Sequence, residues 1–297
     1  MGGTDFGDTY AGSTGAYWNQ VNTASFGSAL SYVPEIPWNN SCASELIANY
    51  HGFAVTYGAN GFCNDPVLGE VLYLSTIGGS GGPSGCAFGA PSLIGAVTGT
   101  CAGYPKPSWQ VVPGNPNDGV RDLPDVSLFA ANGVWGHSYV LCFSGGTSSC
   151  QGDPSTWPRA GGTSFSAPIL AGIQALINQR TGDRQGNPNP VYYALARDQY
   201  GPTGNTACDS TLGNGIAGNC IFNDVTQGDN NINCVAYPNT GILYNCYLPS
   251  GVNGVFSTAN TSYQPAYRAT PGWDFTTGLG TVNAFNLVMA WPLPPMP

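Results

Sequence analysis

A serine at the start of a helical pattern is the feature of this 297-residue sequence that most directly suggests chemistry. Ser164 lies in the segment Gly-Gly-Thr-Ser-Phe-Ser-Ala-Pro, residues 161–168, and apolar residues follow at positions 169, 170, 173, 176 and 177. This spacing predicts a helix that ends near Thr181 and Gly182. Because a helix N-terminus has unpaired N–H groups and a partial positive charge, it stabilises a developing oxyanion, and glycines let a substrate backbone approach. We therefore predict that Ser164 is a nucleophile, although Thr and Ser are also ordinary helix caps.

The composition excludes several classes of protein. Charged residues make up 8% of the chain, and seven Lys and Arg against sixteen Asp and Glu give a formal net charge of −9. Such a surface has no basic stripe for a phosphate backbone, so nucleic acid is not an expected partner. No apolar run approaches the roughly 20 residues that span a bilayer, so we expect no membrane insertion. Few charges and many small polar residues suit a secreted protein that works in acid.

The ten cysteines predict disulfides in an oxidising compartment. No Cys-x-x-Cys pair is present and there are only two histidines, so a zinc site is not expected. Short separations predict the local pairs Cys142 with Cys150, Cys208 with Cys220, and Cys234 with Cys246, while the full connectivity stays open. We expect a secreted protein or one of a lysosome-like acidic compartment, although the N-terminus has no signal-peptide pattern.

Alternating strand and helix patterns predict an α/β fold around a mainly parallel sheet. Strand patterns cover residues 29–34, 122–131 and 138–143, the latter two as short buried strands. Further helix patterns cover residues 189–196, with a proline at the start, and 282–290. The whole chain, residues 1–297, reads as a single, partial domain.

Several motifs occur in the order found in the sedolisins, and the chain resembles this family of serine-carboxyl peptidases, which share the subtilisin fold. They are Gly-Gly-Thr at 2–4, Pro-Asp-Val-Ser at 124–127, Gly-Gly-Thr-Ser-x-Ser-Ala-Pro at 161–168, Phe-Asn-Asp-Val-Thr at 222–226, and Pro-Gly-Trp-Asp-x-x-Thr-Gly-Leu-Gly at 271–280. The resemblance implies a subtilisin-like three-layer sandwich that lacks its N-terminal strands. It also implies that Ser164 attacks the scissile carbonyl of a peptide or protein substrate and forms an acyl-enzyme.

The resemblance implies partners that this sequence lacks. Sedolisins use a Glu as general base, an Asp that orients it, and a protonated Asp as oxyanion donor, all N-terminal to the Gly-Gly-Thr with which this chain starts. A carboxylate suits this role because imidazole is mostly protonated below pH about 6. Glu35, Glu45 and Glu70 match no catalytic motif, and we interpret them as surface or loop acids. We therefore expect the missing N-terminal part of the same domain to be a partner, and this chain alone to be inactive.

A calcium site is implied by the two C-terminal motifs. Asp224 and Asp274 would supply carboxylates, and the main-chain carbonyls of Val225, Thr270 and Gly272 would complete an oxygen cage for Ca²⁺, within a calcium-binding region of about residues 220–280. The alternative is that both aspartates only cap turns.

Two other functions remain open. A subtilisin-type peptidase would use His51 with Ser164 and an Asp, but the Thr-His expected after His-Gly is absent, and both His51 and His137 read as structural loop histidines. The other alternative is a non-catalytic secreted pseudopeptidase or binding module. The side-chain specificity, the choice between endopeptidase and tripeptidyl peptidase, and the oligomeric state stay open, with a monomer as the simplest expectation.

Overall fold

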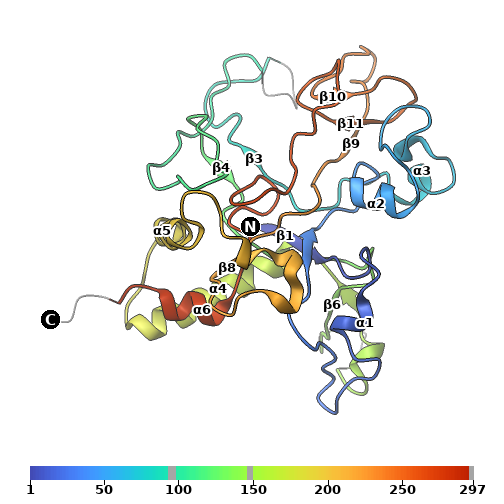
Figure 1. Cartoon of the computed structure of the whole chain (residues 1–297). Coiled ribbons are helices and arrows are strands. Elements are labelled where there is room, and N and C mark those ends of the chain that lie inside the picture. Colours follow the sequence, from blue (N-terminus) through green and yellow to red (C-terminus); the bar gives the residue numbers. More distant parts are fainter. Residues whose placement is uncertain (93–97, 146–149, 294–297) are drawn as a thin grey trace.

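A five-stranded sheet forms the centre of the molecule, in the order β2-β1-β5-β12-β8 (Figure 1). The structure is a computed structural model that describes residues 1–92, 98–145 and 150–293. The three central strands run parallel, and each edge strand is antiparallel to its neighbour. The expected α/β fold with a parallel sheet is thereby confirmed at the centre of the sheet. The strands, in spatial order, are β2 (Glu35–Pro37), β1 (Gly2–Phe6), β5 (Ser127–Phe129), β12 (Thr281–Val282) and β8 (Phe222–Asn223).

Smaller sheets and six helices complete the described architecture. The antiparallel sheet β10-β11-β9 contains β9 (Asn233–Cys234), β10 (Cys246–Tyr247) and β11 (Gly254–Phe256). Two hairpin-like pairs join β3 (Gly82–Pro83) to β4 (Asp122–Leu123) and β6 (Tyr139–Val140) to β7 (Arg159–Ala160). The helices are α1 (Thr14–Tyr17), α2 (Glu45–Tyr50), α3 (Gly69–Leu72), α4 (Thr163–Thr181), α5 (Asn189–Tyr200) and α6 (Ala284–Ala290). Among the described residues, no helix combines the length and apolar composition needed to cross a lipid bilayer.

Two apolar cores hold these layers together. The larger core lies between the sheet and the helices α4, α5 and α6, which Figure 1 shows on one side of the sheet. The second core lies where α2 packs near β2 and β11. The side chains with the least exposure in the larger core come from α4, α5, α6, β8 and the loop before β12, namely Ile177, Tyr193, Leu287, Phe222, Trp273 and Leu279.

The helix α4 buries only part of its apolar surface. Ile173 and Ile177 lie in the larger core, whereas Ile169 and Leu176 are 42% and 52% exposed. An apolar residue that faces solvent on a 19-residue helix gains none of the free energy that burial would provide. The helix is therefore apolar on a face that no described residue covers.

His137 joins the segment after β5 to the end of β1. Its Nδ1 lies 3.2 Å from Asp5 Oδ1, its Nε2 lies 3.1 Å from Asp8 Oδ1, and its side chain is 13% exposed. Burial alone would lower the pKa of His137, but hydrogen bonds and attraction to both aspartates outweigh it and raise the pKa to about 9. The imidazole is therefore charged at neutral and acidic pH, and we call this group the His137 clamp.

All ten cysteines are paired, and each pairs with the next cysteine along the chain. The three predicted short pairs are confirmed. The two others, Cys42–Cys63 and Cys86–Cys101, close loops of similar size. Each bridge restricts the unfolded chain and pins a loop that has little secondary structure of its own.

The predicted strand at residues 29–34 is wrong. The strand begins at Glu35 instead, and Leu30 is 55% exposed because its segment only forms a short bridge back to α1 and Trp18. The pattern at 122–131 divides into β4 and β5, with Pro124 between them. The predicted helices agree with α4, α5 and α6 within a few residues at each end.

Two adjacent positions on α4 test this account of the core. We expect Ile177→Ala to lower the free energy of unfolding by about 2–5 kcal/mol, since it removes a fully buried side chain. We expect Leu176→Ala, its half-exposed neighbour, to change it by less than about 0.5 kcal/mol. Urea unfolding of both variants measures the difference, and equal losses would contradict the assignment of the buried face.

The His137 clamp predicts a stability that falls in alkali. The pKa of folded His137 lies above its unfolded value, so its contribution is complete below pH about 6.5 and is lost as pH rises through about 9. We expect His137→Gln to lower the free energy of unfolding at pH 6 by about 1–3 kcal/mol and to reduce its decline between pH 6.5 and 9. Denaturation at several pH values measures this. His51→Gln is the matched control, because His51 hydrogen-bonds a tyrosine, and an equal effect in both variants would contradict the clamp.

Candidate functional site

Ser164 is exposed at the second position of α4. The residue before the helix, Gly162, has φ 126° and ψ 149°, a backbone conformation that a side chain disfavours. Among the described residues, none forms a hydrogen bond with the Ser164 hydroxyl. The first turn of a long helix thus presents a free hydroxyl to solvent next to unpaired backbone N–H groups.

The first turn of α4 is anchored to the end of β5. Gly162 N donates a hydrogen bond to Ala130 O at 2.6 Å, and the buried hydroxyl of Ser166 donates to Phe129 O at 2.9 Å. A side chain at Gly161 would bring its Cβ within 2.2 Å of Ala131 O. The double glycine is therefore required for this close approach, and the contacts fix where the Ser164 hydroxyl stands.

Glu35 corrects our interpretation of the three glutamates as surface or loop acids. It is 5% exposed on β2, where Thr4 Oγ1 donates to Oε1 at 2.9 Å and the hydroxyls of Tyr32 and Thr281 also donate to the carboxylate. Burial raises the pKa of Glu35, and the three hydroxyl hydrogen bonds offset part of this. The alternating pattern gave no warning because the edge strand turns Glu35 toward the sheet.

The other two glutamates are partly exposed and also engaged elsewhere. Glu45 pairs with Arg268 and accepts a hydrogen bond from the Tyr263 hydroxyl at 3.0 Å. Glu70 accepts a 3.4 Å hydrogen bond from Asn253. None of the three glutamates contacts Ser164, so they do not supply a general base there.

Neither histidine contacts Ser164. His51 caps the C-terminus of α2, with Nε2 3.0 Å from the Tyr73 hydroxyl, and stacks on Phe62. His137 is held in its clamp with Asp5 and Asp8. The histidine and its two aspartates lie about 130 residues apart in the chain, so no local pattern could have brought them together. The triad with His51 therefore gains no support from the hydrogen bonds.

Asp224 and Asp274 are brought together, as the calcium prediction requires. Both are buried, and the charge of Asp274 adds to the effect of burial in raising the pKa of Asp224 to about 7. Burial likewise raises the pKa of Asp274 to about 6. Two desolvated carboxyls that repel one another are the arrangement that a bound cation would relieve.

The unused oxygens at this site fit a hard cation. Asp224 Oδ2 accepts the Gly272 N–H at 2.7 Å, but the buried Oδ1 has no hydrogen-bond partner among the described residues. In that same part of the chain, nothing donates a hydrogen bond to the carbonyl oxygens of Val225, Thr270 or Gly272. Asp274 is already well supplied, since its Oδ1 accepts N–H bonds from Thr276 and Thr277 and its Oδ2 accepts the Thr270 N–H.

The acidic count at this site is low. No group of three or more His, Cys, Asp or Glu residues with metal-binding geometry occurs in the described ranges. Two carboxylates and three carbonyls would leave the remaining coordination to water, which calcium sites accept. Gly272 has φ +84°, and a Cβ there would lie 2.6 Å from Pro113 O, so the tight turn that would direct these carbonyls requires glycine.

Comparison with known proteins gives partial matches. No protein-family model matches the chain. It is 28% identical over 193 residues to kumamolisin from Bacillus sp. (strain MN-32), which covers 63% of this chain and 24% of kumamolisin. It is 27% identical over 176 residues to tripeptidyl-peptidase 1 from Dictyostelium discoideum and 27% over 179 residues to physarolisin from Physarum polycephalum, covering 58% of this chain in each case and 19% and 20% of those proteins.

One solved structure is similar over a longer stretch. A Pseudomonas sedolisin, a serine-carboxyl proteinase complexed with two molecules of pseudo-iodotyrostatin, matches 97% of this chain and 44% of its own with 19% identity and a TM-score of 0.42. The chain matches only about a quarter or less of the length of the curated relatives. The sequence matches and the ordered motifs agree on one relationship: this chain is related to the serine-carboxyl peptidases of the sedolisin family.

Proposed function

We propose that this chain carries the nucleophile of a serine-type peptidase domain that works in acid. The observation that carries the proposal is the exposed, unbonded hydroxyl of Ser164 at the N-terminus of α4. In this reaction Ser164 Oγ attacks the carbonyl carbon of a peptide bond and loses its proton to a general base. The C–N bond then breaks, the amine leaves with a proton, and water hydrolyses the ester.

The general base would come from polypeptide that this chain does not contain. The three glutamates and two histidines bond to other groups, as described above. A carboxylate of ordinary pKa remains a proton acceptor at pH 4–5, where imidazole does not. The isolated chain is accordingly proposed to be inactive, and the choice between endopeptidase and tripeptidyl-peptidase activity stays open.

The uncovered face of α4 supports such a partner. Pro168, Ala171, Gly172, Ala175 and Leu176 are all exposed along this face. It begins one turn after Ser164, so a polypeptide packed on it would lie beside the nucleophile. We propose that the part of the domain that supplies the acid pair packs here, because the same contact would bury the apolar face and place the carboxylates near Ser164.

The proposed working compartment is extracellular or lysosome-like. Five disulfides form in oxidising compartments. Burial or mutual repulsion raises the pKa values of Asp224 and Asp274, and these groups favour the folded state more as pH falls. Both observations suit a protein that works in acid outside the cytosol.

A chimera tests the peptidase proposal. The segment of kumamolisin that matches this chain would be replaced by the corresponding 193 residues of this chain. We expect cleavage of an internally quenched peptide at pH 3–5, and a loss of at least about 10³-fold on Ser164→Ala, because the nucleophile is removed. The isolated chain should give only background hydrolysis.

Controls separate a folding failure from a catalytic one. Ser155→Ala, at another exposed serine, should leave the activity unchanged. A chimera that unfolds cooperatively but has no activity would favour the alternative, a non-catalytic binding module, which the empty surroundings of Ser164 also fit. Turnover by the isolated chain that depends on Ser164 would contradict the proposed division of the catalytic groups.

We further propose that Asp224 and Asp274, with the carbonyls of Val225, Thr270 and Gly272, hold a calcium ion. The ion would supply positive charge between two buried carboxyls and tie the segment after β8 to the loop before β12. Its role would be structural, since no described nucleophile lies among these residues. The buried, partnerless Asp224 Oδ1 is the observation that favours this site.

Calcium should raise the thermal stability of the protein. A ligand that binds only the folded form at 100 times its Kd adds about 2.7 kcal/mol, which is roughly 5–10 °C in Tm for a chain of this size. We expect Asp224→Asn to abolish most of this rise and Asp183→Asn, at an exposed aspartate, to retain it. A melting temperature at pH 6 that does not respond to calcium would contradict the site.

A further inference from the structure

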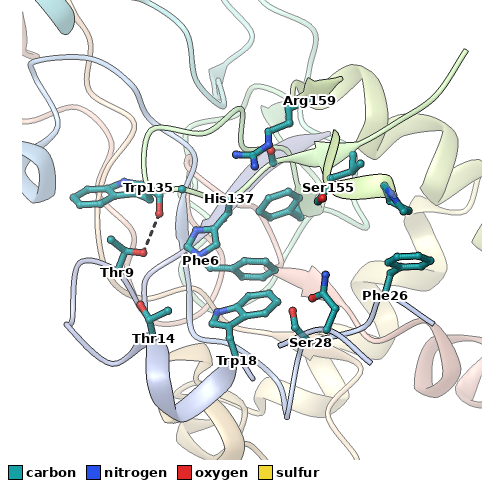
Figure 2. A pocket seen from close by; sticks show the side chains of 16 residues that line it. Phe6, Thr9, Thr14, Trp18, Phe26, Ser28, Trp135, His137, Ser155 and Arg159 are labelled. Atoms are coloured by element: carbon teal, nitrogen blue, oxygen red, sulfur yellow. Dashed lines mark hydrogen bonds between the residues drawn. The ribbon is translucent and has the colours of Figure 1, made fainter. Parts of the chain in front are cut away.

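The largest described cavity lies beside the hairpin-like pair β6–β7, not at the calcium residues. Its volume is about 580 Å³, and it is open to solvent. Figure 2 shows aromatic side chains around it, with Trp18 and Phe6 on one side, Phe26 at the outer edge and Arg159 at the opposite end. We call this cavity the aromatic pocket.

The rings of the pocket are fixed before any ligand arrives. Phe6 stacks on Phe129 with ring centroids 4.7 Å apart, and Trp18 stacks on His137 at 5.9 Å. Trp18 Nε1 donates to Asp8 Oδ2 at 3.1 Å, so the clamp that holds His137 also holds the indole. Because these rings are already ordered, a ligand would lose little affinity to the cost of arranging them.

These rings are only partly covered by protein. Phe6, Trp18, Phe129 and His137 each keep intermediate exposure, and Phe26 is 51% exposed. A planar apolar group in the pocket would therefore bury aromatic surface that now contacts water. Aromatic pairs also contribute about 0.5–1.5 kcal/mol beyond this burial, which favours an aromatic group over an aliphatic one.

Arg159 adds a positive charge to the pocket. Its side chain is exposed and has no carboxylate partner among the described residues. His137 is charged as well, but Asp5 and Asp8 neutralise it. Arg159 is therefore the group that can receive a carboxylate from a ligand in this pocket.

The pocket and Ser164 share one short segment of chain. Val140 and Arg159, which pair across β6 and β7, both line the pocket. Arg159 precedes Ser164 by five residues, which span at most about 18 Å when fully extended. The ring of Tyr139 stacks on Phe165 with centroids 4.9 Å apart, so β6 also packs against the residue that follows Ser164.

We infer that the aromatic pocket binds the aromatic side chain of a peptide's C-terminal residue, with Arg159 pairing with the free carboxylate. The assignment of this pocket to the substrate of Ser164 rests on the proposed function. The pocket would then select peptides with an aromatic residue within a few positions of the bond that Ser164 attacks. Binding itself requires no general base and no catalytic turnover.

Direct binding to the Ser164→Ala chain tests this inference. The probes are N-acetyl-Ala-Phe with a free carboxylate, the same peptide as the C-terminal amide, and N-acetyl-Ala-Ala with a free carboxylate. Quenching of tryptophan fluorescence and isothermal titration calorimetry measure the affinity, since Trp18 and Trp135 line the pocket. We expect the Phe acid to bind at least about 10-fold more tightly than the Ala acid, from burial of the ring, and about 2- to 5-fold more tightly than the Phe amide.

Variants locate the binding. Phe26→Ala should weaken the Phe acid several-fold, whereas Phe285→Ala, at a 73% exposed phenylalanine on α6, should not. Arg159→Gln should remove the difference between acid and amide and leave the affinity for the amide unchanged. Neither Phe26 nor Arg159 is buried, so we expect both variants to fold, and their melting curves check this.

The results that overturn the inference are specific. Equal affinity for the Phe and Ala acids, or equal loss in Phe26→Ala and Phe285→Ala, excludes the aromatic pocket as the site. An acid-to-amide difference that survives Arg159→Gln excludes the assigned carboxylate partner. Because no turnover is measured, binding with an inactive chimera would refute only the peptidase proposal, and an active chimera without binding would refute only this inference.

Discussion

The position of the first turn of α4 on the end of β5 is the constraint on which the rest of this structure depends. Ser166 donates to Phe129 O and Gly162 N donates to Ala130 O, so the helix can begin at only one place. A parallel strand at the centre of the sheet is held on both sides by β1 and β12 and cannot easily shift. The free hydroxyl of Ser164 therefore stands on the most rigid part of the fold, as a nucleophile must.

The same strand end organises the aromatic pocket. Phe129 bonds to Ser166 through its carbonyl and stacks on Phe6 through its ring. The His137 clamp then fixes the segment after β5 against the end of β1, with Trp18 held by the same Asp8. One strand thus positions the proposed nucleophile on one side and the aromatic rings on the other, and the two features are built from a single set of contacts.

Local patterns predicted what local physics determines. The helix after Ser164, the proline-started α5 and the three short disulfides all follow from spacing within about 20 residues. The errors concern long-range pairing: the edge strand begins at Glu35, which the fold buries against Thr4 and Thr281, and His137 meets aspartates from the other end of the sheet. The calcium residues were identified from paired motifs, but only the fold shows that Asp224 Oδ1 is left without a partner.

The central claim is that Ser164 is acylated by a peptide. Acid quenching of the chimera during turnover, followed by intact mass and peptide mapping, tests it most directly. The account predicts an ester adduct with the mass of the acyl portion of the substrate on the peptide that contains Ser164, and its absence after Ser164→Ala. An adduct at another residue, or efficient turnover with no adduct on a chain trapped under single-turnover conditions, would contradict it.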